Sequence, residues 1–136
     1  MTRTVVKGKA NPKLKKMYEL VKEGQEIGFG LLKDGVDGSA VHNRIAEHFE
    51  KEGFKTGQMD GRMQGFFHGT GHGVGLEIHE PPRVSSVKQT ILASQVVTVE
   101  PGLYYLDAGG VRIEDLVVVT KTGIKNLTQF PKVLEL

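Results

Sequence analysis

Three histidines in a short glycine-rich stretch are the first residues in the sequence whose types and spacing could do chemistry. His68, His72 and His79 lie where glycine recurs at every second or fourth position. A neutral imidazole is a metal ligand, and an imidazole that titrates near neutral pH is a general acid or base. The spacing of His68 and His72 is that of helical zinc-binding pairs, but the glycines between them disfavour a helix. The alternative is that all three are ordinary histidines of a flexible loop.

The positions of His72 and His79 constrain the backbone between them. In one continuous strand their side chains would point to opposite faces, because the positions differ by an odd number. We therefore expect the chain to change conformation around Gly73–Gly75, so that both imidazoles reach one site. A strand anchored by Val74, Leu76 and Ile78 is expected to follow.

Two carboxylates occur in valine-rich segments farther along the chain. Glu100 ends an apolar run just before Pro101, and Glu114 follows Arg112 inside a second run. Residues two apart share a face of a strand, and a charge on a packed face is costly unless it is paired or bound to a metal. An ion pair of Arg112 with Glu114 or Glu100 on a solvated face is the simpler alternative. Imidazole with carboxylates and no sulfur suits zinc, manganese or cobalt.

Helices and strands that would position these residues can be read from periodicity. Asn11 followed by Pro12 is a typical helix start, although Gly24, Gly28 and Gly30 weaken the second half of that helix. Ser39 is expected to cap a second helix, ended by Gly53, whose buried stripe is Val41, Ile45 and Phe49. Strands are expected at residues 2–6, 95–100, 103–106, 111–120 and 124–127. This order predicts an α+β fold, with two helices packed on a mainly antiparallel sheet.

Composition excludes several classes of protein. The chain has 136 residues, 38% hydrophobic and 25% charged, which predicts one globular domain spanning residues 1–136. Cysteine is absent, so disulfides and thiolate chemistry are excluded. The net charge of +2 comes from interspersed signs, so neither nucleic acid nor a membrane is expected as a partner. No signal peptide or membrane-spanning run is recognisable, and a cytoplasmic location is expected.

Three motifs in order resemble the aminopeptidase P and prolidase branch of the pita-bread metallopeptidases, the fold shared with methionine aminopeptidase and creatinase. They are the segment from His68 to Glu80, the Val-Glu-Pro-Gly-Leu-Tyr segment around Glu100, and the Gly-Gly-Val-Arg-Ile-Glu-Asp segment around Glu114. The resemblance covers nearly the whole chain. His68 ahead of His72, and Tyr104 after the Glu-Pro-Gly sequence, are more similar to the proline-specific branch than to methionine aminopeptidases.

The resemblance implies a role for each of these residues. His72, Glu100 and Glu114 match metal ligands, and Glu114 matches the one that bridges two metals. His68 and His79 match catalytic histidines that bind the substrate or carry protons, and Arg112 matches a residue that supports the metal carboxylates. The implied activity is that of an Xaa-Pro aminopeptidase or dipeptidase, in which a metal-bound hydroxide hydrolyses the bond between an N-terminal residue and proline. Short peptides with proline at the second position are then the substrates, and manganese, cobalt or zinc is the cofactor.

The same resemblance implies that part of the family's catalytic domain lies outside this sequence. Thr2-Arg3-Thr4 looks like the strand that follows the second of two upstream aspartate ligands in the family. On this interpretation the chain is the C-terminal half of a pita-bread domain, has at most one well-ligated metal of the expected two, and is weakly active or inactive alone. We also expect a homodimer or association with the missing half-domain, because Val5, Val97, Val99, Val117 and Val119 would lack cover. Alternatives are a non-catalytic peptide-binding module of this fold and a metal-free creatinase-like amidinohydrolase.

Overall fold

The computed structural model describes residues 1–136 and begins its regular structure with helix α1 (Pro12–Leu31). The Asn11 side chain accepts a hydrogen bond from the Leu14 N–H at 2.8 Å, so the expected N-terminal cap is confirmed. The helix runs without interruption past Gly24 and Gly28. A Cβ at Gly24 would lie 2.7 Å from the Phe49 ring. Tertiary packing thus overrides the low helix propensity of glycine here, because these positions allow close approach of other elements.

Helix α2 (Gly38–Lys51) begins two residues earlier than expected. Its N-cap is Asp37 and not Ser39: the Asp37 carboxylate accepts from both the N–H and the hydroxyl of Ser39, each at 2.9 Å. The predicted apolar stripe is confirmed, since Val41, Ile45 and Phe49 are all fully buried. The helix ends at Lys51, and Gly53 follows with a φ of 88°, a conformation that favours glycine.

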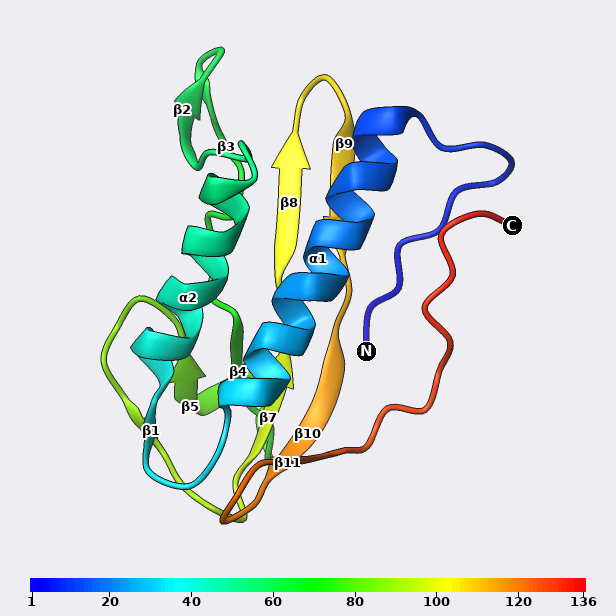
Figure 1. Ribbon diagram of the computed structural model, residues 1–136. Coiled ribbons are helices and arrows are strands. Elements are labelled where there is room, and N and C mark those ends of the chain that lie inside the picture. Colours follow the sequence, from blue (N-terminus) through cyan, green and yellow to red (C-terminus); the bar gives the residue numbers. More distant parts are fainter.

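A five-stranded antiparallel sheet lies behind the two helices (Figure 1), in the order β11-β10-β7-β4-β5. Its strands are β4 (Gly71–Gly73), β5 (Glu80–Val84), β7 (Val96–Val99), β10 (Asp115–Val119) and β11 (Ile124–Asn126). Three two-stranded pairs complete the structure: β1 (Val36–Asp37) with β6 (Thr90–Ile91), β2 (Gly57–Met59) with β3 (Arg62–Gln64), and β8 (Gly102–Tyr105) with β9 (Gly109–Arg112). The expected α+β architecture is therefore confirmed.

Two predicted strands are corrected by the structure. Residues 111–120 do not form one strand: β9 ends at Arg112 and β10 starts at Asp115, so Ile113 and Glu114 lie at a break between pairing with β8 and pairing with β7. The strand expected after Gly75 does not form either. Leu76 and Ile78 are exposed in an irregular loop, because the pairing of β4 with β5 resumes only at Glu80. The expected change of conformation around Gly73–Gly75 is confirmed.

The N-terminal segment runs along the sheet without becoming a full strand. Thr2 forms an isolated antiparallel bridge with Glu114, and Val6 forms an isolated parallel bridge with Glu135. The backbone is thus extended at residues 2–6, as expected, but pairs only at these points. Figure 1 shows this segment beside the C-terminal tail. No helix of the chain has the length and hydropathy needed to cross a membrane.

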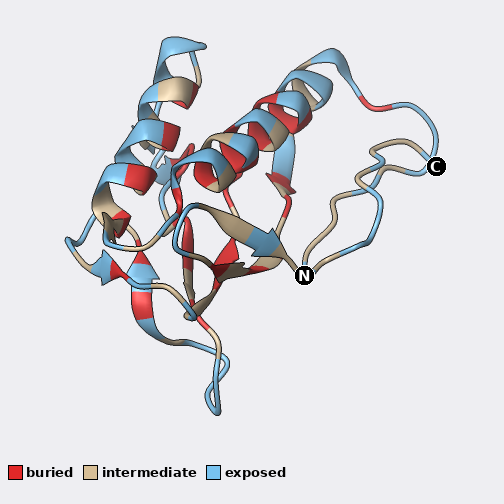
Figure 2. Cartoon of the chain, turned by 60° about the horizontal axis from the view of Figure 1, so that its bottom comes forward, coloured by how far each residue is buried: buried red, intermediate tan, exposed pale blue.

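The hydrophobic core lies between the helices and the sheet. Figure 2 shows buried residues in stripes along both helices and along the central strands. Val97, Val99, Val117 and Val119 belong to this core and are at most 1% exposed. The expectation that these valines lack cover is therefore wrong, because the helices cover that face; only Val5, 50% exposed, fits it. The homodimer inferred from them stays a prediction.

Candidate metal centre

Glu100 lies directly after β7, and Glu114 lies at the break between β9 and β10. The Glu100 N–H donates to the Thr70 carbonyl at 2.7 Å. The backbone of Glu114 exchanges hydrogen bonds with Thr2, whose hydroxyl also donates to the Glu114 carboxylate. Both side chains are mostly enclosed, at 16% and 15% exposure. Each carboxylate therefore comes from a point where the regular ladder stops and the backbone is held by another segment.

His72 faces Glu100 from the middle of β4. The His72 Nδ1–H donates to the Gly73 carbonyl at 2.9 Å, so in the neutral imidazole Nε2 carries a lone pair. That Nε2 lies 3.2 Å from a carboxylate oxygen of Glu100. Two acceptors this close repel each other unless a cation, either a proton or a metal ion, lies with them. The same Nδ1–H bond fixes the imidazole in the orientation that a metal-ligating histidine uses.

The hydroxyl of Thr98 links the two ligand strands. It accepts from the His72 N–H and donates to the Glu100 carboxylate, both at 3.1 Å. Thr98 is 3% exposed, so this link is shielded from water. The sequence reasoning did not single out Thr98, although a polar residue inside a valine run was a signal that could have found it.

His72, Glu100 and Glu114 each offer one ligand atom, and the three atoms lie within 4.8 Å of one another. A cavity of about 410 Å³ opens over them. One imidazole and two carboxylates suit zinc, manganese or cobalt in chemistry and in count. These three predicted residues are thus brought together, and they fit a single divalent cation.

His79 and Arg112 border the same group. The ring centroids of His72 and His79 are 4.3 Å apart, so the predicted convergence of the two imidazoles is confirmed. Arg112 approaches Glu100 with its Nε at 4.0 Å from a carboxylate oxygen, whereas it forms no ion pair with Glu114. That contact is at the limit of an ion pair, and the part-exposed Met1 ammonium lies 3.6 Å from the Glu114 carboxylate, so both carboxylates are only loosely paired.

His68 lines a second cavity, of about 290 Å³, together with His72, His79 and Glu100. Its Nδ1–H donates to the Gly69 carbonyl at 2.8 Å, and its Nε2 accepts from the Tyr104 hydroxyl at 3.0 Å. Burial lowers the pKa of His68 and raises the pKa of Tyr104. Both groups are therefore neutral near pH 7, which is the state that this hydrogen bond requires.

Tyr104 is a site residue that sequence reasoning used only as a marker of the family branch. Its ring lies over two glycines: a Cβ at Gly110 would be 2.7 Å from the ring, and a Cβ at Gly102 would be 2.6 Å from the hydroxyl. The pattern of glycines around Tyr104 was a signal that its ring needs this space.

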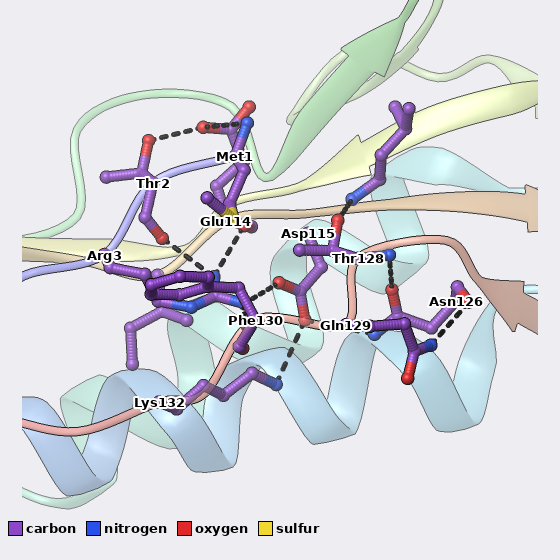
Figure 3. Close-up of polar contacts among 12 residues, drawn as sticks. Met1, Thr2, Arg3, Glu114, Asp115, Asn126, Thr128, Gln129, Phe130 and Lys132 are labelled. Carbon is purple, nitrogen blue, oxygen red and sulfur yellow. Dashed lines mark hydrogen bonds and ion pairs between the residues drawn. The ribbon is translucent and has the colours of Figure 1, made fainter.

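A second charged cluster, around Asp115, lies beside Glu114 (Figure 3). Arg3 donates to the Asp115 carboxylate at 2.6 Å and to the Glu114 carbonyl at 2.8 Å. Lys132 and Asn126 also contact the Asp115 carboxylate, each at 3.1 Å. Burial alone would raise the pKa of Asp115, but hydrogen bonds from Arg3, Asn126 and Lys132 hold it below its ordinary value. Asp115 is thus an internally paired carboxylate next to Glu114 in the chain.

Residues 1–121 match the model of metallopeptidase family M24, and the chain belongs to this family. The family uses divalent metals, in agreement with the cluster of His72, Glu100 and Glu114. The fold is that of the pita-bread peptidases, so the resemblance read from the three motifs is confirmed.

Individual relatives carry Xaa-Pro names. The chain is 42% identical over 134 residues to an Xaa-Pro dipeptidase of Pyrococcus horikoshii, covering 95% of this chain and 35% of the relative. It superposes on an Xaa-Pro dipeptidase from Bacillus anthracis with a TM-score of 0.86 at 39% identity, covering 98% of this chain and 36% of that one. An X-Pro aminopeptidase from Thermotoga maritima gives a TM-score of 0.86 at 32% identity, with the same coverage of 98% and 36%. The chain therefore spans about a third of the length of these relatives.

Proposed function

We propose that residues 1–136 are the C-terminal portion of the catalytic domain of a metal-dependent Xaa-Pro exopeptidase, of the aminopeptidase or the dipeptidase type. The observation that carries the proposal is the unshielded approach of His72 Nε2 to the Glu100 carboxylate at 3.2 Å, an arrangement of acceptors that calls for a cation. The Xaa-Pro names of relatives at 32–42% identity support the substrate class. The substrates are then short peptides with proline at the second position.

In this proposal His72, Glu100 and Glu114 hold one divalent cation, for which manganese, cobalt and zinc are the candidates. A bound dication lowers the pKa of water and polarises the scissile carbonyl. Two carboxylates balance the charge of one dication, so a second cation needs other acidic ligands. We therefore propose that two aspartate ligands of the family lie outside these residues, and that the activity of the whole protein depends on them.

His68 and His79 are proposed to act on the peptide and on its protons. His68 lines the cavity next to Glu100, and a peptide bound there would hydrogen-bond to the His68 Nε2 in place of the Tyr104 hydroxyl. His79 is exposed beside His72, so its imidazole can exchange protons with solvent and pass one to the departing amine. Arg112 is proposed to support the Glu100 carboxylate from its position 4.0 Å away.

A homodimer, or association with residues beyond this chain, is expected, with neither nucleic acid nor membrane as a partner. The net charge of +2 supports the absence of a polyanionic partner. A cytoplasmic location stays a prediction.

Titration with Mn²⁺ by isothermal calorimetry tests the metal site. We expect the parent chain to bind one ion, and Glu114→Gln to bind it at least about 10-fold more weakly, because an amide oxygen replaces a charged ligand. Glu47→Gln is the matched control, since Glu47 is an exposed glutamate of α2 that contributes nothing to the cluster. Equal affinity of Glu114→Gln and Glu47→Gln for Mn²⁺ would contradict the ligand assignment.

A further inference from the structure

One polar side chain of helix α1 is completely enclosed in the core. Gln25 is 0% exposed, and its amide Nε2 donates to the Val99 carbonyl at 2.9 Å and to the Ile113 carbonyl at 3.3 Å. A buried amide is costly unless it makes hydrogen bonds, and most helix positions that face a core are apolar. The placement of Gln25 therefore needs a reason that packing alone does not supply.

The two carbonyls that Gln25 contacts have a common relation to the metal centre. Val99 is the residue immediately before Glu100, and Ile113 is the residue immediately before Glu114. The Gln25 amide thus joins the backbones of the two carboxylate ligands from the side of the sheet that the helices cover. Gln25 itself contacts neither carboxylate.

The Ile113 carbonyl has no hydrogen-bond donor other than Gln25. Ile113 lies between β9 and β10, is fully buried, and receives no hydrogen bond from a backbone N–H at its carbonyl. A buried carbonyl without a donor is unfavourable, so the Gln25 amide satisfies it. Without this bond the peptide that leads into Glu114 is held only at its flanks, by Thr2 at Glu114 and by the pairing of Asp115 with Val99.

Helix α1 reaches the sheet closely enough for this contact because of Gly28. A Cβ at Gly28 would lie 3.0 Å from Val99 Cγ1, so a larger residue would crowd the end of β7, and the helix or the Val99 side chain would have to shift. Gly28 is one turn beyond Gln25 on the same helix. The glycine and the glutamine together set how α1 meets the two ligand-bearing segments.

We propose that Gln25 is a positioning residue for the metal centre: by holding the Val99 and Ile113 carbonyls on one amide, it fixes the separation of Glu100 and Glu114. The inference rests on the proposed metal site. Metal–oxygen bonds in such sites are confined to about 2.0–2.2 Å, so a shift of a few tenths of an ångström between the two carboxylates weakens binding. Support of ligands by outer hydrogen bonds is commonly worth about 10- to 100-fold in metal affinity.

The test compares Gln25→Met with Leu20→Ala in the 136-residue chain. Gln25→Met keeps the length of the side chain and removes the donor; Leu20→Ala removes buried apolar volume from the same helix without touching either carbonyl. We expect both variants to unfold at lower urea concentration than the parent. Only Gln25→Met should lose Mn²⁺ affinity in calorimetry, by about 10-fold or more.

A spectroscopic measurement separates positioning from loss of stability. With Co²⁺ in place of Mn²⁺, the visible absorption of the bound ion reports its coordination geometry; we expect it to change in Gln25→Met and to match the parent in Leu20→Ala. Gly28→Ala keeps the Gln25 amide but crowds Val99 next to Glu100, so it should also weaken Mn²⁺ binding, and it replaces Gln25→Met if that variant does not fold. If Gln25→Met binds Mn²⁺ as tightly as the parent and its Co²⁺ spectrum matches that of the parent, the inference is overturned. The same result in Gly28→Ala overturns it if Gln25→Met does not fold. Failure of the parent to bind Mn²⁺ instead overturns the metal site itself.

Discussion

Glu114 and Asp115 are consecutive residues, and each carboxylate belongs to a charged cluster that is balanced in a different way. Asp115 is fully buried against Arg3 and Lys132, which are cations of the same chain (Figure 3). Glu114 shares its cluster with Glu100 and His72, and the nearest basic side chain, Arg112, stays 4.0 Å from Glu100. The Asp115 cluster is thus complete, because two side-chain cations contact its carboxylate directly. The Glu114 cluster is incomplete, because its two carboxylates and imidazole have only long contacts with cations, from the Met1 ammonium at 3.6 Å and from Arg112 at 4.0 Å.

The number of cations and hydrogen-bond donors around each carboxylate thus distinguishes a structural ion pair from a ligand-binding site. A buried carboxylate that already has two cations and an amide has no capacity left for a metal. A pair of carboxylates facing an imidazole lone pair has such capacity. Acidic residues in β-strands are thus ambiguous in sequence, and the position of their cations decides which kind of cluster they form.

The largest expected effect is on peptidase activity, and it tests whether the Glu114 cluster needs further metal ligands. We expect the 136-residue chain to release little or no N-terminal residue from an Xaa-Pro peptide with added Mn²⁺, because two carboxylates balance only one dication. An extended chain that carries the two family aspartates should cleave at least about 100- to 1000-fold faster, the range that a single oxyanion donor already contributes. The assay is release of the free amino acid.

A control for that assay is Glu114→Gln in the extended chain, which should lose the gained activity. Turnover by the 136-residue chain equal to that of the extended chain would show that the incomplete cluster is sufficient as it stands, or that a partner chain completes it.

The next largest effect is on stability, when a substitution removes one cation from the Asp115 cluster. Arg3→Met leaves the buried Asp115 carboxylate with Lys132 and Asn126 alone, and we expect about 3 kcal/mol of lost stability, at the lower end of the cost of breaking a buried ion pair. Urea denaturation without metal measures it. Lys9→Met is the matched control, because Lys9 pairs with Glu135 while 87% exposed, where such pairs contribute about 0–1 kcal/mol. If Arg3→Met and Lys9→Met lose the same free energy of unfolding, the buried Arg3–Asp115 pair contributes no more than an exposed ion pair.

Much of the incomplete cluster was predictable from sequence because its residues carry local signals. The glycine-rich spacing of the histidines, the glutamate before Pro101 and the glutamate after Arg112 all lie in short motifs. The apolar stripe of α2 was equally readable, since its period reflects a single buried face. Local pattern and local structure agree at these points.

The supporting contacts were not predictable, because they depend on distant parts of the chain. Arg3 and Asp115 are 112 positions apart, and Gln25 lies 74 and 88 positions from the carbonyls it holds. The break at Ile113 looked like continuous strand, since both flanks are rich in valine and isoleucine and only the change of pairing partner interrupts them. The loop around Leu76 has an alternating pattern typical of a strand, yet no partner strand lies beside it.

The smallest expected effect is on how the stability of the Asp115 cluster changes with pH. Hydrogen bonds hold the pKa of Asp115 in the folded chain below its ordinary value of 3.8, so the unfolded chain binds a proton there more readily than the folded one. The stability from this group is therefore present above about pH 4 and is lost as the pH falls through the lower, folded-state pKa. Asp115→Asn removes the titration, so its free energy of unfolding should fall less than that of the parent between pH 7 and pH 3. Urea denaturation across that range measures the slopes, with Glu47→Gln, which removes an exposed carboxylate of α2, as the surface control. If the parent and Asp115→Asn lose stability in parallel, Asp115 does not carry the acid sensitivity, and its cluster is less firmly paired than the contacts with Arg3 and Lys132 indicate.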